Sequence, residues 1–389
     1  MGAGYPIWQI TFKEDINYKG KDYATKGAVI EFADTMKEHF PDPGSRQRTV
    51  EHAPIEEDIE RRDFTVNMLL KDMTTGEIED LTGTSKKDIE QGVLRGHPRV
   101  SLDKIFKDDP LRMLRLIRFQ AKYGWKIPGD VLRTVKRNAD RIEVVSAERI
   151  MEELKKVMKL GKMKAAIQLM SATGLLKHIL PEVEKLKGVK QPERHHGEGD
   201  VYRHTLKVLE ETGPGIDKQM AALLHDIGKP ETQEILTDNI TFYGHDDAGA
   251  EIAQAILKRL KFDKATQERI KKMVKYHMRP HRLPEDPSAK ALRKFVRDVG
   301  EELMDAVLDL ANADSLGRIP SKSTIPDLRE KIDKVMKDHP VKSDPLLGGK
   351  EIMSLLGLKT GPSVGRAKKL LDDIEDEYAD KDEKLTKEK

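Results

Sequence analysis

Two short stretches near the start of the chain, residues 7–12 and 28–32, are rich in β-branched and aromatic side chains. Such runs are typical of β-strands. A further strand and turn is predicted at residues 74–81, with Gly76 in the turn. Residues 39–54 are rich in proline, glycine and charged side chains, which predicts an exposed loop. The N-terminal part of the chain is therefore predicted to hold a small β-sheet.

From Asp103 onward, apolar residues recur with the period of an α-helix over almost the whole chain. Ser146 is a good N-cap residue and predicts that a helix begins there. The Gly- and His-rich residues 188–200 interrupt the helical pattern, and residues 324–345 are predicted to link to a last segment. From about Asp372, charges of both signs indicate a solvated helix end and a frayed tail. The predicted fold class is α+β, predominantly α-helical, with a partial N-terminal β-sheet.

The composition excludes some kinds of site without indicating a partner. The chain has 70 Lys and Arg residues against 68 Asp and Glu residues, so any basic surface must be local. The absence of cysteine excludes disulfides and thiolate metal sites. No apolar run approaches the length of a membrane span, and the first residues lack the apolar core of a signal peptide. We therefore expect a cytoplasmic protein without a membrane partner.

A cluster of charged residues at 60–63 runs directly into an apolar stretch that ends at Leu69. One interpretation is a helix N-terminus with a solvated face. The other is a binding site in which Arg61 and Arg62 contact a triphosphate, because guanidinium groups bind phosphate through paired hydrogen bonds. Asn67 would then form a hydrogen bond with a ribose hydroxyl.

A second charged motif, at residues 108–119, combines helix-start signals with a stripe of arginines. An aspartate serves as N-cap, and Pro110 suits the first helical position. Asp109 and Arg112 are one helical turn apart and are predicted to share a face. A carboxylate accepts from an exocyclic amino group and a guanidinium donates to a ring nitrogen, so this pair would select adenine and cytosine and reject guanine and uracil. The alternative is a surface ion pair worth less than about 1 kcal/mol.

These motifs resemble those of class II tRNA nucleotidyltransferases and bacterial poly(A) polymerases. Residues 61–69, RRDFTVNML, resemble the family signature RRDFTxNAL, with Met68 in place of alanine. Residues 108–119 resemble the element EDxxRxxRxxRF, with Asp108 in place of glutamate. The resemblance implies template-independent addition of C and A to RNA 3′ ends, with tRNA, CTP and ATP as partners. The nucleotide-binding residues that it implies are Arg61, Arg62, Asp63, Asn67, Asp109, Arg112, Arg115 and Arg118.

Residues 146–154 resemble a third element of the same family, SxERIxxEL. This element is interpreted as architectural. Arg149 is predicted to pair with Glu152 or Glu153 at helical spacing and so to brace the neck of the protein.

The resemblance also implies a catalytic head in which two aspartates hold Mg²⁺ ions. Before Arg61 the sequence has no GGxxRD loop followed by DxD. Residues 7–13 resemble the family's strand EVTTFR, but Trp8 and Gln9 stand where its carboxylate is expected. We therefore expect a truncated head, with polymerase activity that is lost or that needs a separate polypeptide to supply the head. The remaining alternative is that other residues have taken over the metal-binding role.

A further set of residues consists of His204, His225, Asp226 and Asp314. It resembles the H…HD…D pattern of HD phosphohydrolases. A His-Asp dipeptide alone indicates nothing, but here it ends an apolar helical pattern, which favours a ligand site over solvated surface. The alternative is a set of core histidines with satisfied hydrogen bonds. Mixed imidazole and carboxylate ligation suits Mn²⁺, Ni²⁺, Fe²⁺ or Zn²⁺, and such an ion makes water a nucleophile at neutral pH.

The resemblance to HD phosphohydrolases assigns roles at this site. Lys229 would neutralise a phosphate and act with His204, His225 and Asp226 in catalysis. The metal ligands that it implies are His204, His225, Asp226, His245, His277 and Asp314. The implied substrates include 2′,3′-cyclic phosphates and 2′-nucleotides. The other histidines considered, His195, His196 and His281, are interpreted as ordinary side chains.

The resemblances cover almost the whole chain and predict four parts. These are a partial nucleotidyltransferase head at residues 1–100, a helical neck at 101–187, an HD domain at 188–323 and a tRNA-contacting helical segment with a charged tail at 324–389. Three functions stay open: addition of C and A to RNA, metal-dependent phosphohydrolysis, and tRNA binding without catalysis. Addition of CCA and addition of poly(A) are both compatible with these motifs.

Overall fold

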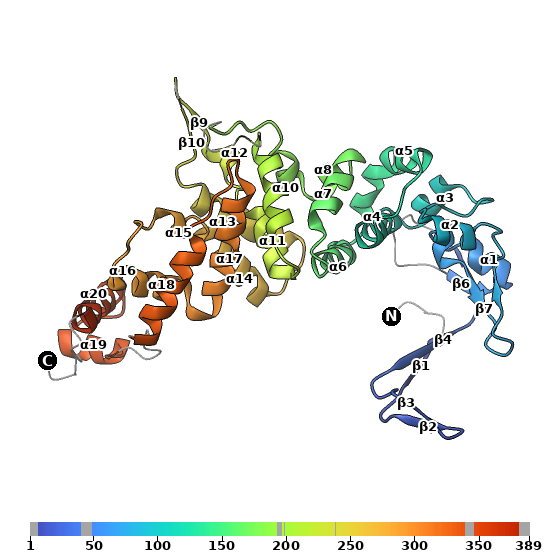
Figure 1. The fold of residues 1–389 in the computed structure, drawn as a ribbon, viewed down its shortest axis with the longest axis horizontal. Coiled ribbons are helices and arrows are strands. Elements are labelled where there is room, and N and C mark those ends of the chain that lie inside the picture. The colour runs from blue at the N-terminus through green and yellow to red at the C-terminus, as the bar shows by residue number, and fades with distance from the viewer. Residues whose placement is uncertain are drawn as a thin grey trace. The chain divides into compact units, whose positions relative to one another are not determined.

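The computed structural model describes residues 7–39, 49–192, 197, 199–237, 239–338 and 346–380. Helices account for 59% of the chain and the strands are short and antiparallel, which confirms the predicted α+β, mostly helical fold class. The chain divides into two compact units, Met1–Glu184 and Lys185–Lys389, referred to as unit 1 and unit 2 (Figure 1). Among the described residues, no helix is both long and apolar enough to span a membrane.

Unit 1 begins with pairs of short antiparallel strands. The pairs are β1 (Ile7–Thr11) with β4 (Val29–Ala33), β2 (Ile16–Tyr18) with β3 (Lys21–Tyr23), β5 (Met36–His39) with β6 (Thr49–His52), and β7 (Leu70–Lys71) with β8 (Ile78–Glu79). The predicted strands are thus confirmed. The prediction of a loop through residue 54 is wrong at its end, because the β-branched Thr49 and Val50 pair with β5 instead.

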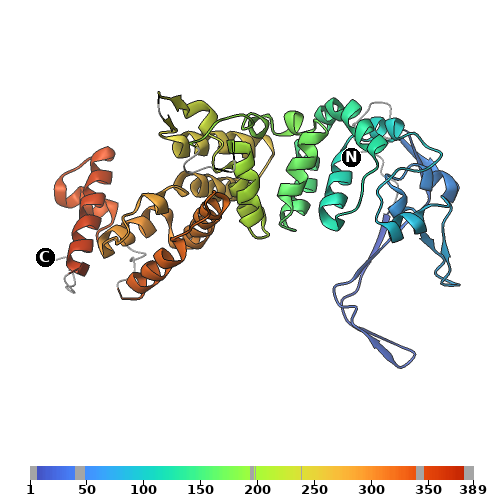
Figure 2. The same ribbon diagram turned by 45° about the horizontal axis from the view of Figure 1, so that its top comes forward.

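The ribbon of β1 and β4 is exposed on both sides. Trp8 lies opposite Phe32, and Ile10 lies opposite Ile30, and each of these four side chains is roughly half exposed. No described helix covers the ribbon (Figures 1 and 2). Gln9, where the family strand was expected to carry a carboxylate, lies directly opposite Glu31 of β4.

The rest of unit 1 is helical. Its helices are α1 (Ile55–Glu60), α2 (Ser85–Gln91), α3 (Leu102–Asp108), α4 (Leu111–Tyr123), α5 (Gly129–Asn138), α6 (Ala147–Met158), α7 (Met163–Ala172), α8 (Leu176–Ile179) and α9 (Pro181–Glu184), with 3-10 turns η1 (Thr65–Asn67) and η2 (Ala139–Val144). The α6 helix begins after Ser146 as predicted, but the Ser146 side chain forms no capping hydrogen bond. The amphipathic α4 packs against α6 and α7, and this packing fixes the arginine stripe relative to the neck.

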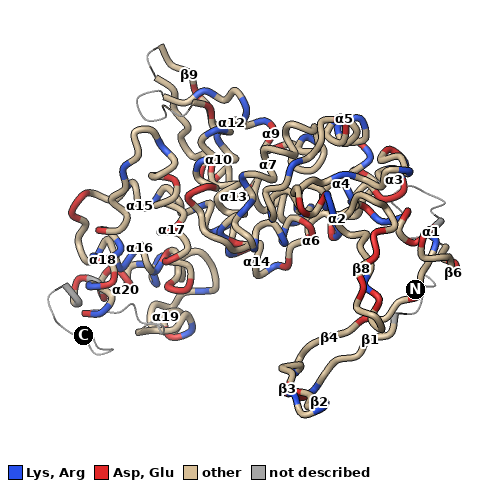
Figure 3. The backbone as a smooth tube through the Cα atoms, turned by 45° about the vertical axis from the view of Figure 1, so that its right-hand side comes forward, with Lys and Arg blue, Asp and Glu red and all other residues tan. Residues whose placement is uncertain are grey.

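Unit 2 is a helical unit with one small hairpin, and its charges of both signs are interspersed along the backbone, as in unit 1 (Figure 3). Its elements are α10 (Val201–Glu211), α11 (Ile216–Leu224), α12 (Lys229–Thr232), β9 (Glu234–Ile235), β10 (Ile240–Thr241), α13 (His245–Arg259), α14 (Lys264–Tyr276), α15 (Arg279–Arg282), α16 (Ala289–Val299), α17 (Glu301–Gly317), α18 (Ile325–Asp338), α19 (Gly349–Leu356) and α20 (Pro362–Asp380). The prediction of a linker at residues 324–345 is wrong for its first part. Residues 325–338 form α18, which buries Ile325, Leu328 and Ile332. The helical pattern of these three residues was obscured by the charges between them.

Close packing of α17 on α10 is the feature of unit 2 that matters most for its site. Asp200 caps α10 by accepting a hydrogen bond from the Arg203 N–H at 2.9 Å. A β-carbon at Gly317 would lie 2.8 Å from Cγ2 of Val208, so only glycine lets α17 approach α10 this closely. The approach places Asp314 of α17 beside His204 of α10, with Nε2 of His204 2.9 Å from Oδ1 of Asp314.

Candidate nucleotide-binding module and candidate metal centre

The two arginines of the RRDFT motif are held by one buried carboxylate. Asp58 of α1 accepts from Nε and Nη2 of Arg61 through Oδ1, and from Nε and Nη2 of Arg62 through Oδ2, at 2.6–3.2 Å. Burial alone would raise the pKa of Asp58, but its hydrogen bonds with Arg61 and Arg62 hold the pKa below the ordinary value. The arginine side chains remain 28% and 31% exposed, so each fixed guanidinium can still meet a phosphate.

Asp63 and Asn67 join this motif to the arginine stripe of α4. Oδ1 of Asp63 accepts from Nδ2 of Asn67 at 2.9 Å, and Oδ2 accepts from Nε of Arg115 at 2.6 Å. Asp63 is buried. Three of the predicted nucleotide-binding residues are therefore linked to one another, and Asp63 serves to position the other two.

Asp109 and Arg112 lie next to each other at the start of α4, as their spacing predicts. Oδ1 of Asp109 accepts from the Leu111 N–H at 3.2 Å, but α4 begins at Leu111 with Pro110 as its N-cap, so the predicted aspartate N-cap is one residue too early. The Arg112 side chain is buried, and its Nη1 donates to the carbonyl of Ile105 at 3.3 Å. Burial lowers the pKa of Arg112, and the charge of Asp109 opposes this effect most strongly among its neighbours.

Arg149 forms an ion pair with a residue other than its predicted partners. Its Nη2 lies 2.8 Å from Oδ2 of Asp109, so the predicted pairing with Glu152 or Glu153 is wrong. The correct partner is forty residues away in the sequence, and tertiary packing of α6 on α4 brings the two together. Arg149 thus holds the same carboxylate that the predicted A- and C-selective pair would need.

Arg118 and Glu153 form the ion pair that braces α4 against α6. Nε of Arg118 lies 2.5 Å from Oε2 of Glu153, and Nζ of Lys156 lies 2.8 Å from Oε1. Burial alone would raise the pKa of Glu153, but hydrogen bonds from Lys156 and Arg118 hold it below the ordinary value of 4.5. The charge of Glu153 therefore contributes to stability above pH 4.5, and this contribution is lost as the pH falls through the lowered pKa.

Replacing Glu153 by Gln is expected to destabilise unit 1 by about 3 kcal/mol at pH 7, because it leaves the Arg118 guanidinium without its buried counter-charge. Urea unfolding monitored by circular dichroism measures the change. The matched control is Glu152→Gln on the exposed side of α6, which should change stability by less than about 0.5 kcal/mol. The difference between wild type and Glu153→Gln should shrink below pH 4.5. Equal effects of the two substitutions at pH 7 would contradict the bracing role.

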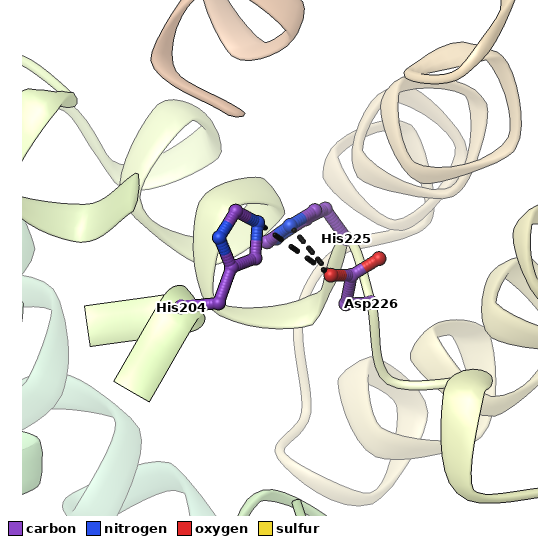
Figure 4. Close-up of side chains that lie close together, drawn as sticks. All are labelled: His204, His225 and Asp226. Carbon is purple, nitrogen blue, oxygen red and sulfur yellow. Dashed lines mark ion pairs between the residues drawn. The ribbon is translucent and has the colours of Figure 1, made fainter. Parts of the chain in front are cut away.

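The predicted metal ligands of unit 2 come from five separate elements and meet at one buried point. They are His204 in α10, His225 and Asp226 at the end of α11, His245 at the start of α13, His277 at the end of α14, and Asp314 in α17. All six side chains are buried. Figure 4 shows His204 and His225 directed toward the carboxylate of Asp226.

Three of these histidines are held in the tautomer that metal ligation requires. Nδ1 of His225, His245 and His277 lies 2.6–2.8 Å from a backbone carbonyl, respectively that of Ala222, Phe242 and Val274. A carbonyl only accepts, so Nδ1 carries the proton and Nε2 presents a lone pair. Nε2 of each of these three rings has no hydrogen-bond partner among the described residues.

The lone pairs at Nε2 face carboxylate oxygens rather than donors. The distances from Nε2 of His225, His245 and His277 to the nearest oxygen of Asp226 are 3.2, 3.5 and 3.8 Å. Two acceptors at this separation in a buried site are unfavourable unless a cation lies between them. Satisfied core histidines, the alternative interpretation, would not leave such contacts.

The protonation states also suit a cation. Burial, together with the charges of His225 and His245, lowers the pKa of His277 to about 3, so this imidazole is neutral at ordinary pH. Burial likewise lowers the pKa of His245. Burial alone would raise the pKa of Asp226 and Asp314, but neighbouring side chains hold both well below 3.8, notably His225 and Lys229 for Asp226 and Arg318 for Asp314. The centre thus offers neutral imidazoles at His245 and His277 and charged carboxylates, the forms that bind divalent metals.

Basic side chains surround the carboxylates of this centre. Nζ of Lys229 lies 2.7 Å from Oδ2 of Asp226 and donates to Oε1 of Gln191 at 2.6 Å. Nε2 of His281 lies 3.0 Å from Oδ2 of Asp314, and Arg318 pairs with the same oxygen. The interpretation of His281 as an ordinary side chain is therefore wrong. His195 and His196 lie outside the described residues.

Several residues of these two sites were not predicted from the sequence. Asp58 lies three and four positions before Arg61 and Arg62, and Arg318 lies four positions after Asp314, so helical spacing could have identified both. Nothing in the local sequence relates Gln191 or His281 to the metal centre.

Gly228 decides how closely α13 approaches the His-Asp turn. A β-carbon at this position would lie 2.3 Å from the carbonyl oxygen of His245 and 2.6 Å from the amide nitrogen of Gly249. Both contacts are with backbone, so they are relieved only if α13 moves.

Replacing Gly228 by Ala is therefore expected to displace His245 from Asp226 and to destabilise unit 2 by about 1–3 kcal/mol. Metal affinity, measured by isothermal titration calorimetry with Mn²⁺, should fall by roughly 10- to 100-fold. The control is Gly213→Ala, where a β-carbon would have no neighbour within 4 Å. Unchanged Mn²⁺ affinity in Gly228→Ala would show that the position of α13 does not matter.

Comparison with known proteins shows the family to which the chain belongs. Three family models match the chain: the poly(A) polymerase head domain at residues 8–95, the probable RNA- and SrmB-binding site of polymerase A at 124–187, and the HD domain at 201–319. A CC-adding tRNA nucleotidyltransferase from Thermus thermophilus is 34% identical over 84% of this chain and 75% of its own length. The chain belongs to the tRNA nucleotidyltransferase family.

A second relative is similar in sequence, and two solved structures are similar in fold. An A-adding tRNA nucleotidyltransferase from Deinococcus radiodurans is also 34% identical, over 82% of this chain and 74% of its own length. The fold resembles the Bacillus stearothermophilus CCA-adding enzyme in complex with CTP, with a TM-score of 0.61, 19% identity and coverage of 93% of this chain and 76% of that one. It also resembles the Thermotoga maritima CCA-adding enzyme complexed with tRNA, with a TM-score of 0.51, 19% identity and coverage of 91% and 79%.

Proposed function

We propose that unit 1 selects CTP and ATP for addition to the 3′ end of tRNA, and that unit 2 hydrolyses phosphate esters at a metal centre. The first half is supported by the relatives, which are CC-adding and A-adding enzymes at equal identity. The second half is supported by the geometry around Asp226, where three imidazole lone pairs face one carboxylate.

In unit 1 the adjacency of Asp109 and Arg112 carries the proposal. Adenine and cytosine both present an amino donor beside a ring acceptor, which match a carboxylate and a guanidinium; guanine and uracil present the reverse. Asp109 accepts a hydrogen bond from Arg149. When a base binds, its amino group would therefore replace Arg149 as the donor to Asp109. Arg61 and Arg62, held by Asp58, would bind the triphosphate, and Asn67 would contact the ribose.

Nucleotidyl transfer also uses carboxylates that hold Mg²⁺ ions. Gln9 stands at the strand position where a carboxylate is expected, and glutamine carries no charge. Among the described residues, the groups of side chains close enough to hold a metal are all in unit 2. We propose that the Mg²⁺ ligands for transfer come from a polypeptide segment other than the described part of unit 1, for example a separate head polypeptide.

The transfer proposal is tested by offering the 389-residue chain tRNA that lacks its CCA end, with Mg²⁺ and with CTP, ATP or both. We expect the chain alone to bind CTP and ATP but to add neither nucleotide. A second tRNA that ends in CC separates addition of A from addition of C. Robust incorporation by the chain alone would overturn the claim about the Mg²⁺ ligands, and equal binding of GTP and UTP would overturn the claim about base selection.

In unit 2, His204, His225, Asp226 and Asp314 would hold a divalent transition metal, with His245 and His277 as further ligands. Such an ion would supply a water nucleophile at neutral pH and withdraw charge from phosphoryl oxygens. Lys229 is buried beside Asp226 and would neutralise a phosphate oxygen. Arg318 and His281, on the far oxygen of Asp314, hold this carboxylate in place.

Hydrolysis of 2′,3′-cyclic AMP in the presence of Mn²⁺ or Ni²⁺ tests the second half of the proposal. We expect metal-dependent hydrolysis that is lost in His225→Ala. The control His178→Ala, at a histidine of unit 1 that pairs with Glu143, should retain activity. Absence of hydrolysis of cyclic and 2′-phosphate substrates with every metal tried would overturn the phosphohydrolase proposal.

A further inference from the structure

A groove of about 570 Å³ lies in unit 1 at the end of α4, where this helix packs on α7 (Figure 1). It is separate from the nucleotide-binding module, because Asp109 and Arg112 lie at the opposite end of α4. Much of its lining is apolar and includes Ile127, Leu132 and Leu169. We propose that this groove binds an unpaired nucleotide of single-stranded RNA, with the base stacked on Trp125.

Trp125 is the last ring of an aromatic stack. The rings of Phe119 and Tyr123 are nearly parallel, with centroids 6.3 Å apart, and those of Tyr123 and Trp125 lie 4.7 Å apart. Tyr123 thus covers one face of the indole, and a β-carbon at Gly92 would lie 2.9 Å from its Cδ1, so the ring is held from two sides. The rest of the ring lines the groove and is partly exposed. Bases of single-stranded nucleic acids stack on aromatic side chains of this kind.

Two glutamines of the groove can form hydrogen bonds with a base. Gln120 comes from α4 and Gln168 from α7, and both line the groove. Within the described part of the chain, neither side-chain amide forms a hydrogen bond. An amide both donates and accepts, so it can match the edge of a base. Contacts to phosphate alone would call for cations instead, and an apolar peptide would leave both amides unpaired.

The charges around the groove also favour RNA over an apolar segment of protein. Lys126 lines the groove, and none of its lining residues in the described part of unit 1 is acidic. From residue 120 to residue 136 the chain has one acidic residue, Asp130, and the basic residues Lys122, Lys126, Arg133 and Lys136. Nζ of Lys122 lies 4.6 Å from the ring centroid of Tyr123. Aromatic rings beside basic side chains are typical of sites for single-stranded nucleic acid.

The position of the groove indicates which part of an RNA it holds. The 13 residues of α4 span about 20 Å, with the proposed base-selecting pair at one end and Trp125 just beyond the other. A stacked strand advances about 3.4 Å per nucleotide, so this distance corresponds to roughly six nucleotides. A strand whose 3′ end lies at Asp109 would place an upstream base on Trp125. The groove therefore favours RNA with an unpaired tail longer than a CCA end. This placement rests on the proposed transfer function, whereas strand binding is measured without nucleotide addition.

Tryptophan fluorescence tests the proposal, because the chain has two tryptophans, Trp8 and Trp125. In the Trp8→Phe variant of the full chain, Trp125 is the only tryptophan. A single-stranded oligoadenylate of about twelve nucleotides should quench its emission to saturation, as a base stacks on the indole. Inorganic polyphosphate, which has the charge of RNA but no bases, should not quench it. An RNA duplex of the same length should quench it far less, because its bases are already paired.

Replacing the contacting side chains gives an independent measurement by fluorescence anisotropy of the labelled oligoadenylate. Its affinity should fall by roughly 5- to 100-fold in Trp125→Leu, the effect of losing one stacked base. Gln168→Ala, at an exposed position of α7, should lower the affinity by roughly 3- to 10-fold. The matched control Gln254→Ala, in α13 of unit 2, should leave it unchanged. Circular dichroism establishes that each variant is folded, and Gln168→Ala decides the matter if Trp125→Leu is not.

Absence of quenching by oligoadenylate would overturn the proposal, as would unchanged affinity in the folded variants. Energy transfer from Trp125 to the apolar dye ANS that RNA does not displace would also overturn it and would indicate a protein segment as the occupant. Binding of CTP and ATP without quenching by oligoadenylate would retain the transfer proposal and reject the groove. Quenching by oligoadenylate without binding of CTP and ATP would have the opposite meaning.

Discussion

Replacing Asp226 by Asn is expected to abolish phosphohydrolysis in unit 2, with a loss of at least about 10³-fold in kcat/KM, equivalent to about 4 kcal/mol. The amide has nearly the same volume as the carboxylate, so packing is retained. It is uncharged, however, and it presents an NH2 donor where the carboxylate has an acceptor. The carboxylate of Asp226 lies 3.2–3.8 Å from Nε2 of His225, His245 and His277, so its replacement impairs the whole centre.

Two measurements distinguish this result from general damage. Hydrolysis of 2′,3′-cyclic AMP gives the loss of activity, and equilibrium dialysis against Mn²⁺ gives the loss of binding. The control Asp309→Asn lies in α17, the helix of Asp314, but its carboxylate pairs with Lys218 at the surface. It should leave both quantities unchanged. Full Mn²⁺ binding by Asp226→Asn would refute the assignment of Asp226 as a ligand.

The second large effect is expected in unit 1, where Asp109→Asn should weaken CTP and ATP binding by roughly 10- to 100-fold, since a paired contact to a base edge is worth about 1–3 kcal/mol. The asparagine oxygen can keep the hydrogen bond from the Leu111 N–H, so the start of α4 is preserved. The new NH2 group cannot accept from the amino group of adenine or cytosine. Binding of GTP and UTP should be unchanged or stronger, and the preference for A and C should disappear.

Fluorescence titration with the four nucleoside triphosphates measures this change in selectivity. The control Asp103→Asn removes a carboxylate that pairs with the exposed Arg137, away from Asp109. It should leave the order of affinities unchanged. An equal loss of affinity for all four triphosphates in Asp109→Asn would indicate a general effect on the site and would exclude a role in base selection.

Much of the fold follows from local sequence signals. The β-rich runs near residues 7–12 and 28–32 formed β1 and β4, and the helical periodicity beyond Asp103 formed helices. Predictions were wrong where charges obscured the pattern, as in α18, or where a strand depended on its partner, as in β6. A strand is stabilised by cross-strand contacts, so its neighbour matters as much as its own residues.

The ion pairs of the neck show the limit of local reasoning most clearly. Helical spacing predicted that Arg149 would pair with a glutamate in its own helix, but its partner is Asp109 in the loop before α4. Glu153 in turn binds Arg118 of α4. Pairs within one exposed helix face are weak, so the packing of α4 on α6 selects the partners.

The sequence by itself determined which side-chain types are available at each candidate site, because the RRDFT element, the arginine stripe and the HD pattern are local runs whose side-chain types limit what they can bind. The tertiary structure alone decided how these residues are arranged. It brought His204 and Asp314, 110 residues apart, to within 2.9 Å, and it added His281 and Arg318 to the centre. It also turned the two oxygens of Asp226 toward different histidines. Spacing along a chain indicates which side chains share one helix, whereas the direction of a buried lone pair depends on every helix packed around it.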